Sequence, residues 1–314
     1  MIWSLLRKRE NAPIGPALLG KLPCQPDFVR EGFRGPASDA LDAFLVQASP
    51  ILHQGVGVEK LPNLLVCQTL PRQAHSLVGV CAPSRDAAGR PFPVAIVHAL
   101  EQAQLRAVQG EVFWRFSGFV RSAQAMLARL DRLTLADTRS ELDGLTPIDP
   151  NTAAESGRGL PPTATFDRAL RSEESTDPDA QSYALYAVAS AFAARHPGLT
   201  LDCPAQDPAQ ARLWLTLTAR VAEVSASNLC ILYAPEAGRL LIAIDAWHPG
   251  QLRAIAEPSF SFDQLWPLAT PQAEARAHAR SALAGGGNAL TRPRGASTRD
   301  LADQLAEFSQ SLRS

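Results

Sequence analysis

Seven residues near the start of the chain have the types and spacing of a phosphate-binding loop. Residues 15–21 read Gly-Pro-Ala-Leu-Leu-Gly-Lys, which is most of the Gly-x-x-x-x-Gly-Lys pattern of a P-loop. A working P-loop continues with Ser or Thr, whose hydroxyl holds Mg²⁺, and then opens a helix. Here Leu22 follows, and Pro23 and Pro26 are incompatible with a helix interior. We therefore interpret Ala17 to Leu19 as a short strand that ends in a turn.

Hydroxyl, carboxyl and imidazole groups also occur, as a hydrolase would need. Ser84, Asp86 and His98 have the residue types of a hydrolytic triad, but such a triad is recognised by geometry and not by sequence. The chain has no Gly-x-Ser-x-Gly element. Its six histidines include no pair at the spacing of a metal motif, and its five cysteines include no Cys-x-x-Cys. We expect reduced thiols, no metal site and no cofactor.

The most informative polar stretch is the loop at residues 83–93, Pro-Ser-Arg-Asp-Ala-Ala-Gly-Arg-Pro-Phe-Pro. Its prolines and glycine make it stiff and sharply turned. Asp86 and Arg90 are close enough in sequence to form an ion pair, and Ser84 can hydrogen-bond to neighbouring amides. The loop is then either braced by its own ion pair or a rigid recognition surface. We favour bracing for Asp86 and leave both roles open for Arg90 and Phe92.

Short apolar runs predict a sheet that would position this loop. The runs at 64–70, 76–82 and 93–99 are rich in β-branched residues and are bounded by Pro or Gly, as strands are. Their almost continuous hydrophobicity is typical of strands that are covered on both faces. Apolar residues at helical spacing predict one helix over 38–49 and another, of about six turns, over 110–133.

The second half of the chain predicts a closing helix and a hairpin. The helix opens at Asp177-Pro-Asp179 and ends at His196-Pro-Gly198. The runs 228–234 and 239–245 are joined by Pro-Glu-Ala-Gly, which predicts a hairpin and antiparallel pairing. The sequence thus predicts an α/β fold. Its central mixed or antiparallel sheet is covered by helices on both faces, in a layered α/β/α sandwich.

We expect one large domain followed by a tethered tail. The parts in chain order are a flexible N-terminus at 1–12, an α/β domain at 13–265, a flexible Ala-, Arg- and Gly-rich linker at 269–297 and a C-terminal helix at 298–314. Within the domain, 134–176 has little periodicity and predicts a surface connection, and 177–245 supplies the closing helix and strands. The last helix, opened by Ser297-x-x-Asp300, either folds back on its domain or docks into a partner groove.

Composition excludes several classes of protein. The chain has 314 residues, 46% of them hydrophobic, which supports a sizeable core. Its 30 Lys and Arg residues balance 31 Asp and Glu residues, so no basic face for nucleic acid is indicated. No stretch approaches the ~18 apolar residues of a membrane span. The first apolar run is also too short for a signal peptide, so we expect a cytoplasmic protein.

Two stretches carry a resemblance to a known family. Gly20-Lys-Leu-Pro23 is followed by Asp27-Phe-Val-Arg30, and then by Gly79-Val-x-x-Pro83-Ser-x-Asp86-x-x-Gly89-Arg-x-Phe92-Pro93. Together they resemble the paired signatures of the TagF family, accessory proteins of bacterial type VI secretion systems. The resemblance covers the core signature at 17–100 and thins out to 245, where Leu213-Trp214 and 228–232 are similar to the segment that closes the family's domain. Two positions depart from the family pattern. Pro26 stands where the family usually has Gly, so the turn at Pro26 must differ locally. Leu215 stands where the family often has a second Trp.

The resemblance implies a cytoplasmic, non-enzymatic regulator that holds the secretion system inactive after translation. It implies binding to a forkhead-associated-domain scaffold protein and a functional link to a Ser/Thr kinase and phosphatase. We hypothesise that the contact surface is formed by Asp27, Phe28, Arg30, Ser84, Asp86, Arg90 and Phe92. Two other hypotheses stay open, a small-molecule or nucleotide sensor that uses residues 15–21 and a hydrolase that uses Ser84.

Overall fold

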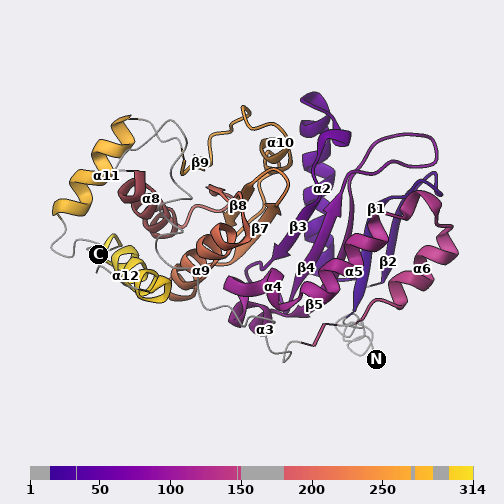
Figure 1. The fold of residues 1–314 in the computed structure, drawn as a ribbon, viewed down its shortest axis with the longest axis horizontal. Helices are drawn as coiled ribbons and strands as arrows, with labels where there is room; N and C mark the ends of the chain where they lie inside the picture. The colour runs from indigo at the N-terminus through magenta and orange to yellow at the C-terminus, as the bar shows by residue number, and fades with distance from the viewer. Residues whose placement is uncertain are drawn as a thin grey trace, which may run out of the picture.

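One sheet of nine strands runs through the computed structural model of this chain (Figure 1). The structure describes residues 15–32, 34–146, 148–149, 180–269, 273–285 and 297–313. The strand order is β2-β1-β5-β4-β3-β7-β8-β6-β9. The expected flexible N-terminus at 1–12 lies outside the described residues, as do large parts of the connection at 134–176 and of the linker at 269–297.

The first half of the sheet is antiparallel throughout. Its strands are β1 (Pro16–Lys21), β2 (Phe28–Gly32), β3 (Leu64–Gln68), β4 (His75–Ala82) and β5 (Val94–Glu101). β1 lies between β2 and β5, and β4 lies between β5 and β3. The three apolar runs predicted as strands are therefore confirmed, and the P-loop-like residues form the body of β1.

The second half extends the same sheet. Its strands are β6 (Thr200–Pro204), β7 (Leu229–Ala234), β8 (Arg239–Ile244) and β9 (Leu265–Pro267). β7 pairs with β3, which joins the two halves, and β7 and β8 form the predicted antiparallel hairpin. β6 and β9 pair in parallel, so the sheet is mixed.

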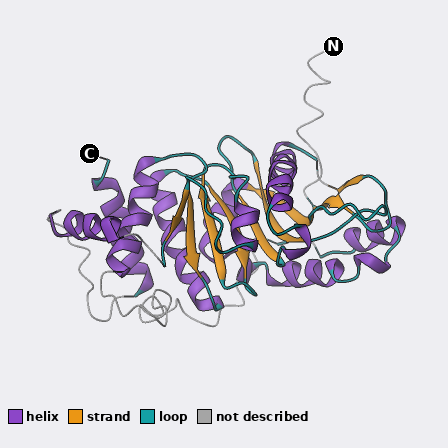
Figure 2. Cartoon of the chain, turned by 90° about the horizontal axis from the view of Figure 1, so that it is seen from above, coloured by secondary structure: helices purple, strands orange, loops and turns teal. Residues whose placement is uncertain are grey.

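Helices cover both faces of the sheet, so the predicted layered α/β/α sandwich is confirmed (Figure 2). The longer helices are α2 (Pro36–Gln54), α5 (Ser117–Leu127), α6 (Leu135–Asp143), α8 (Ala180–Ala194), α9 (Pro208–Ser225), α11 (Ala273–Gly285) and α12 (Thr298–Ser311). The shorter ones are α3 (Gln102–Ala107), α4 (Val112–Arg115), α10 (Gln251–Ala256) and the 3₁₀ turns at Val58–Lys60, Gln109–Glu111 and Leu130–Arg132.

Strand alternation divides the core into two layers. In β1, Leu18 joins the layer of α5, α6, α8, α9 and α12, whereas Leu19 joins the layer of α2 and α10. In β5, Ile96 and Val97 are divided in the same way. Successive side chains of a strand point to opposite faces, so apolar residues at consecutive positions supply both layers.

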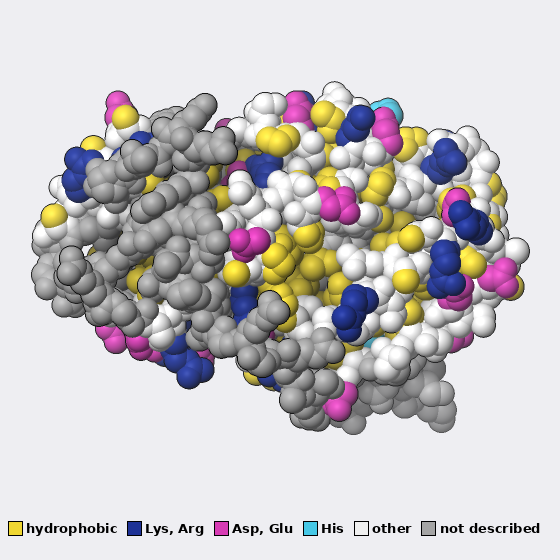
Figure 3. Space-filling view, viewed as in Figure 1, with side chains coloured by type: hydrophobic (Ala, Val, Ile, Leu, Met, Phe, Trp, Pro, Cys, Tyr) yellow, Lys and Arg dark blue, Asp and Glu magenta, His cyan; other side chains and the backbone are white. Residues whose placement is uncertain are grey.

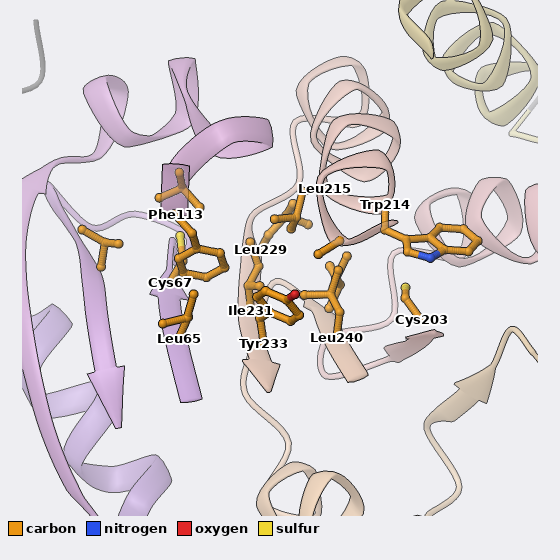
Figure 4. Packing of buried hydrophobic residues seen from close by; sticks show 14 of the residues in the cluster. Leu65, Cys67, Phe113, Cys203, Trp214, Leu215, Leu229, Ile231, Tyr233 and Leu240 are labelled. Carbon is orange, nitrogen blue, oxygen red and sulfur yellow. The ribbon is translucent and has the colours of Figure 1, made fainter. Parts of the chain in front are cut away.

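The core between α9 and the sheet is built around large side chains (Figure 4). Trp214 of α9 is fully buried near Cys203, and its indole N–H donates to the carbonyl of Pro204 at 2.9 Å. Leu215 lies beside Leu229 of β7. These side chains attach α9 to the sheet.

The helix predicted over 110–133 is wrong as a single element. The chain instead forms α4 and α5, separated at Phe116, whose φ and ψ of −103° and 25° are not helical. A straight helix would place Phe113 and Phe119 about 120° apart around its axis. The break lets Phe113, Phe116 and Phe119 all enter the core, so packing overrides the local periodicity.

Three of the longer helices lie where the sequence predicted none. α6 occupies part of the expected surface connection and begins with a capping box between Thr134 and Asp137. α9 was not foreseen, and α11 occupies part of the expected flexible linker.

The predicted last helix is α12, and it folds back on its own chain. Ser309 donates to the carbonyl of Ala189 in α8 at 2.9 Å. Arg220 of α9 pairs with Asp303 at 2.6 Å. Of the two alternatives for this helix, the structure therefore shows the intramolecular one.

Candidate functional site

Two turns meet at one end of the sheet. β1 ends at Lys21 and β4 ends at Ala82, and both strands lie next to the start of β5 at Val94. The β1–β2 turn, residues 22–27, and the β4–β5 loop, residues 83–93, are therefore neighbours. We call these two segments the turn pair, and they hold most of the residues that the sequence singled out.

The carboxylate of Asp86 lies at the centre of the turn pair. One oxygen, Oδ2, lies 3.0 Å from Nζ of Lys21 and 2.6 Å from Nε of Arg90. The other, Oδ1, accepts from the backbone N–H groups of Ala88 at 3.0 Å and Arg90 at 2.9 Å. The Asp86 side chain is fully buried, so this carboxylate is both desolvated and fully hydrogen-bonded. The prediction that Asp86 braces the loop is confirmed.

These partners fix the charge of Asp86. Burial alone would raise its pKa, but the backbone N–H of Arg90, the ammonium of Lys21 and the guanidinium of Arg90 outweigh burial. They hold the pKa of Asp86 well below its ordinary value. Asp86 is therefore an ionised support and not a proton donor at neutral pH.

Three more hydrogen bonds tie the loop to the turn. Nη2 of Arg90 donates to the carbonyl of Pro26 at 2.5 Å. The backbone N–H of Ala87 donates to the carbonyl of Gln25 at 2.8 Å, and the Ser84 hydroxyl donates to the carbonyl of Lys21 at 2.7 Å. Ser84 and Asp86 thus act inside the turn pair. Pro26 contributes its carbonyl, which any residue at that position would offer.

The close approach of β1 to β5 requires glycine at position 20. Gly20 has φ of +137°, and a Cβ there would lie 2.4 Å from the carbonyl oxygen of Pro93. We expect Gly20→Ala to lower the free energy of unfolding by about 2–4 kcal/mol, because strain and overlap add. Gly15→Ala is the matched control, since no heavy atom lies within 4 Å of its added Cβ. Urea unfolding measures both, and equal midpoints for the two variants would contradict this role.

Aromatic and charged side chains of β2 continue the site. The rings of Phe28 and Phe92 contact edge to face, with centroids 5.4 Å apart. The guanidinium of Arg30 lies 5.7 Å from the Phe28 ring centroid and pairs with Asp42 of α2. Phe28, Arg30 and Phe92 are therefore brought together, as the sequence hypothesis required. Asp27 is exposed beside them.

The turn pair separates two surface hollows. One, of about 700 Å³, lies between β2, α2 and α6, and Asp27, Phe28 and Arg30 are among its lining residues. The other, of about 520 Å³, lies between the β4–β5 loop and the end of α5, and Ser84 and Leu127 are among its lining residues. A rigid wall with a hollow on each side is a suitable shape for protein recognition.

The catalytic and nucleotide alternatives gain no support from this geometry. Residues 16–21 form strand β1 rather than a loop that opens a helix. His98 is buried between the carbonyl of Ala99 and the backbone N–H of Ile148, and burial lowers its pKa. Ser84, Asp86 and His98 are each bonded to other groups. Within the described part of the chain, no group of three His, Cys, Asp or Glu residues has the arrangement of a metal site.

Comparison with known protein families matches the N-terminal part of the chain, which carries the turn pair. Residues 17–145 match the TagF N-terminal domain, which is described as type VI secretion system-associated. This segment is a TagF N-terminal domain. The matched TagF segment runs from β1 to just past the end of α6, so it contains both turns and both hollows. The resemblance first seen in the two signatures is therefore confirmed, and the chain is associated with type VI secretion.

The other comparisons add little to the TagF match. A crystal structure of PA0076 from Pseudomonas aeruginosa PAO1 aligns with 82% of this chain and 100% of its own length, at 16% identity and a TM-score of 0.47. No curated protein matched the chain. Among the helices that the structure describes, none has the length and apolar character that crossing a membrane requires.

Sequence reasoning missed several residues of the TagF site. Lys21 was not among the predicted contact residues, yet it is a partner of Asp86. Asp42 lies among the apolar positions of a predicted helix. A carboxylate at such a position is expected to be buried and therefore to have a charged partner, and this signal could have found Asp42. Arg139 lies in α6, where the capping box at Thr134 was the signal of a helix.

Proposed function

We propose that this TagF-family chain is a non-enzymatic cytoplasmic regulator that represses a type VI secretion system after translation. It does so by binding a forkhead-associated-domain scaffold protein, in a pathway linked to a Ser/Thr kinase and phosphatase. The family match supports the association with secretion. The repressor role, the scaffold and the kinase link are the proposed part.

The observation that carries the proposal is the bracing of the turn pair. A buried carboxylate holds Lys21 and Arg90 together, and hydrogen bonds to backbone carbonyls join the two turns. A surface that is rigid before binding loses little conformational entropy when a partner docks. The residues that such a partner would contact are Asp27, Phe28, Arg30, Arg90 and Phe92, whereas Ser84 and Asp86 support them from within.

A non-enzymatic role agrees with how the polar groups are used. The hydroxyl of Ser84 donates to a backbone carbonyl, and Asp86 is ion-paired at the same end of the sheet. A nucleophile needs a base within hydrogen-bond reach. Here these groups serve the fold, which supports binding as the activity.

Calorimetric titration with the scaffold protein tests the proposal. We expect Asp27→Lys to weaken binding by about tenfold or more, because it reverses a charge on the exposed side of the turn pair. Glu307→Lys makes the same change on the exposed face of α12, far along the chain, and should alter affinity less than about twofold. The proposed contact surface is wrong if the two variants bind alike, and the proposed partner is wrong if the unchanged chain shows no binding.

A further inference from the structure

The outer edge of β2 faces the larger hollow, and no other strand in the described part of the chain pairs with it. β2 pairs with β1 on one side, and it is the terminal strand of the sheet. The hollow of about 700 Å³ has Phe28 of β2, Val46 of α2 and Leu135 of α6 among its lining residues. Val46 is 52% exposed, which is unusual for a large apolar side chain of this structure. An edge strand with a hollow beside it can accept another strand.

Alternate side chains of β2 are held by the two flanking helices. Arg30 pairs with Asp42 of α2 on one face of the sheet. Glu31 pairs with Arg139 of α6 on the other face, at 2.6 Å. The strand is thus anchored from both faces, while its outer edge keeps the backbone polar groups that do not face β1.

The ion pairs at this edge are arranged with their cations outward. The side chains of Arg30 and Arg139 are 49% and 54% exposed, whereas those of Asp42 and Glu31 are 8% and 24% exposed. Arg34 is also exposed, with its guanidinium 3.4 Å from the carbonyl of Arg30. Figure 3 shows Lys and Arg side chains at the surface over α5 and α6 on the same side of the molecule. The rim of the hollow therefore offers guanidinium groups that have unused N–H donors.

Among the residues that the structure describes, no group donates to one buried acceptor at the hollow. Oδ1 of Asp42 is inaccessible to solvent and makes no hydrogen bond, although Oδ2 of the same carboxylate pairs with Arg30. Asp42 is among the residues that line the hollow. A buried carboxylate oxygen without a donor is costly, so the Asp42 carboxylate depends on its pairing with Arg30.

We propose that an acidic, extended segment of a partner protein binds at this edge as an additional strand beside β2. Its backbone pairs with the outer edge of β2, and its carboxylates meet Arg30, Arg34 and Arg139. A basic group of the partner, outside this segment, meets Asp27. An apolar side chain of the segment fills the space next to Val46. This inference rests on the proposed function, because it describes how the TagF site holds a protein.

A second copy of this chain fits the same edge poorly. Antiparallel pairing of β2 with itself, centred on Arg30, sets two arginines opposite each other, and like charges in directly opposed positions are destabilising. Charge complementarity therefore favours an acidic partner segment.

Fluorescence polarisation with short labelled peptides tests the inference on the full chain. The probe is a peptide in which pairs of Glu alternate with pairs of Thr around one Val, so that carboxylates lie on both faces of the strand. One control peptide has Lys in place of Glu, and the other carries N-methyl groups on alternate amides of the Glu peptide, which removes strand pairing but keeps the charge. We expect the Glu peptide to bind at least about tenfold more tightly than either control, because charge and backbone pairing both contribute.

Variants of the chain locate the binding edge. We expect Val46→Glu to weaken binding of the Glu peptide about tenfold and Arg34→Glu about fivefold. Gln47→Glu is the matched control, because it adds the same charge at an exposed neighbour of Val46 that does not line the hollow. It should change binding less than about twofold.

Each outcome decides the inference. The inference is supported if the methylated peptide does not bind the unchanged chain and if the Glu peptide does not bind the Val46→Glu variant. No binding of the Glu peptide, equal binding of the methylated or Lys peptide, or equal loss in Gln47→Glu overturns it. If the scaffold still binds the chain in calorimetry while the Glu peptide does not, only the strand-addition inference fails. If neither binds, the proposed function fails as well.

Discussion

Replacing Asp86 by Asn is expected to lower the midpoint of thermal unfolding by roughly 10 °C, because it removes the negative charge from a buried network. Lys21 and Arg90 would then face the neutral side-chain amide of the variant. The N–H₂ group of that amide would replace one carboxylate oxygen, so the N–H groups that donate to this oxygen would lose their acceptor. Circular dichroism at neutral pH measures the midpoint. Asp27→Asn is the control, since Asp27 is exposed, and its midpoint should stay within about 1 °C of the unchanged chain.

The Asp86→Asn variant should also change how the midpoint of thermal unfolding depends on pH. The folded-state pKa of Asp86 is lowered, so the unfolded chain takes up a proton at this position before the folded chain does. Its contribution is complete above the ordinary carboxyl pKa of about 3.9 and is lost as pH falls toward the lower folded value. The gap in midpoint between the unchanged chain and Asp86→Asn should therefore narrow below about pH 4. A gap that stays constant or widens in acid would show that Asp86 is not ionised in the fold.

Truncating Trp214 is the second change with a large expected effect. Trp214→Ala should lower the free energy of unfolding by about 4 kcal/mol, because it leaves a large cavity between α9 and the sheet. Trp214→Phe keeps most of the volume but leaves the carbonyl of Pro204 without the indole N–H, so about 1–2 kcal/mol should be lost. Urea unfolding at equilibrium gives both values.

The decisive comparison is between the free energies of unfolding that Trp214→Ala and Trp214→Phe lose. Equal losses for Trp214→Phe and Trp214→Ala would place the stabilisation in the hydrogen bond rather than in burial. A loss of under about 1 kcal/mol for Trp214→Ala would mean that α9 is not attached as described, since truncation of a well-packed Trp costs several times more.

The strands could be predicted because each depends on a local run of apolar residues. β3, β4, β5, β7 and β8 are all short, rich in aliphatic residues and flanked by turn residues, and all five formed as predicted. The helices were harder to predict. α9 carries buried residues over much of its circumference, so it shows no clear amphipathic stripe in the sequence. The division between α4 and α5 depends on how three phenylalanines pack, which lies beyond any local window.

The candidate site was predicted in part. Asp86 and Arg90 are four residues apart, so their ion pair could be inferred from spacing. The contacts of Asp86 with Lys21 and of Arg90 with Pro26 join residues more than sixty positions apart, and only the pairing of β1 with β5 brings them together. The open edge of β2 and the outward arginines likewise follow from sheet order. No single stretch of the sequence contains this information.

Secretion in the native host is the measurement that tests the central claim most directly. The chain is expressed in excess, and the type VI tube protein in the culture supernatant is compared with an empty vector and with Asp27→Lys. We expect about a tenfold fall with the unchanged chain, a much smaller fall with the variant, and unchanged tube protein inside the cells. Unaltered secretion in the presence of abundant, folded chain would contradict its role as a repressor.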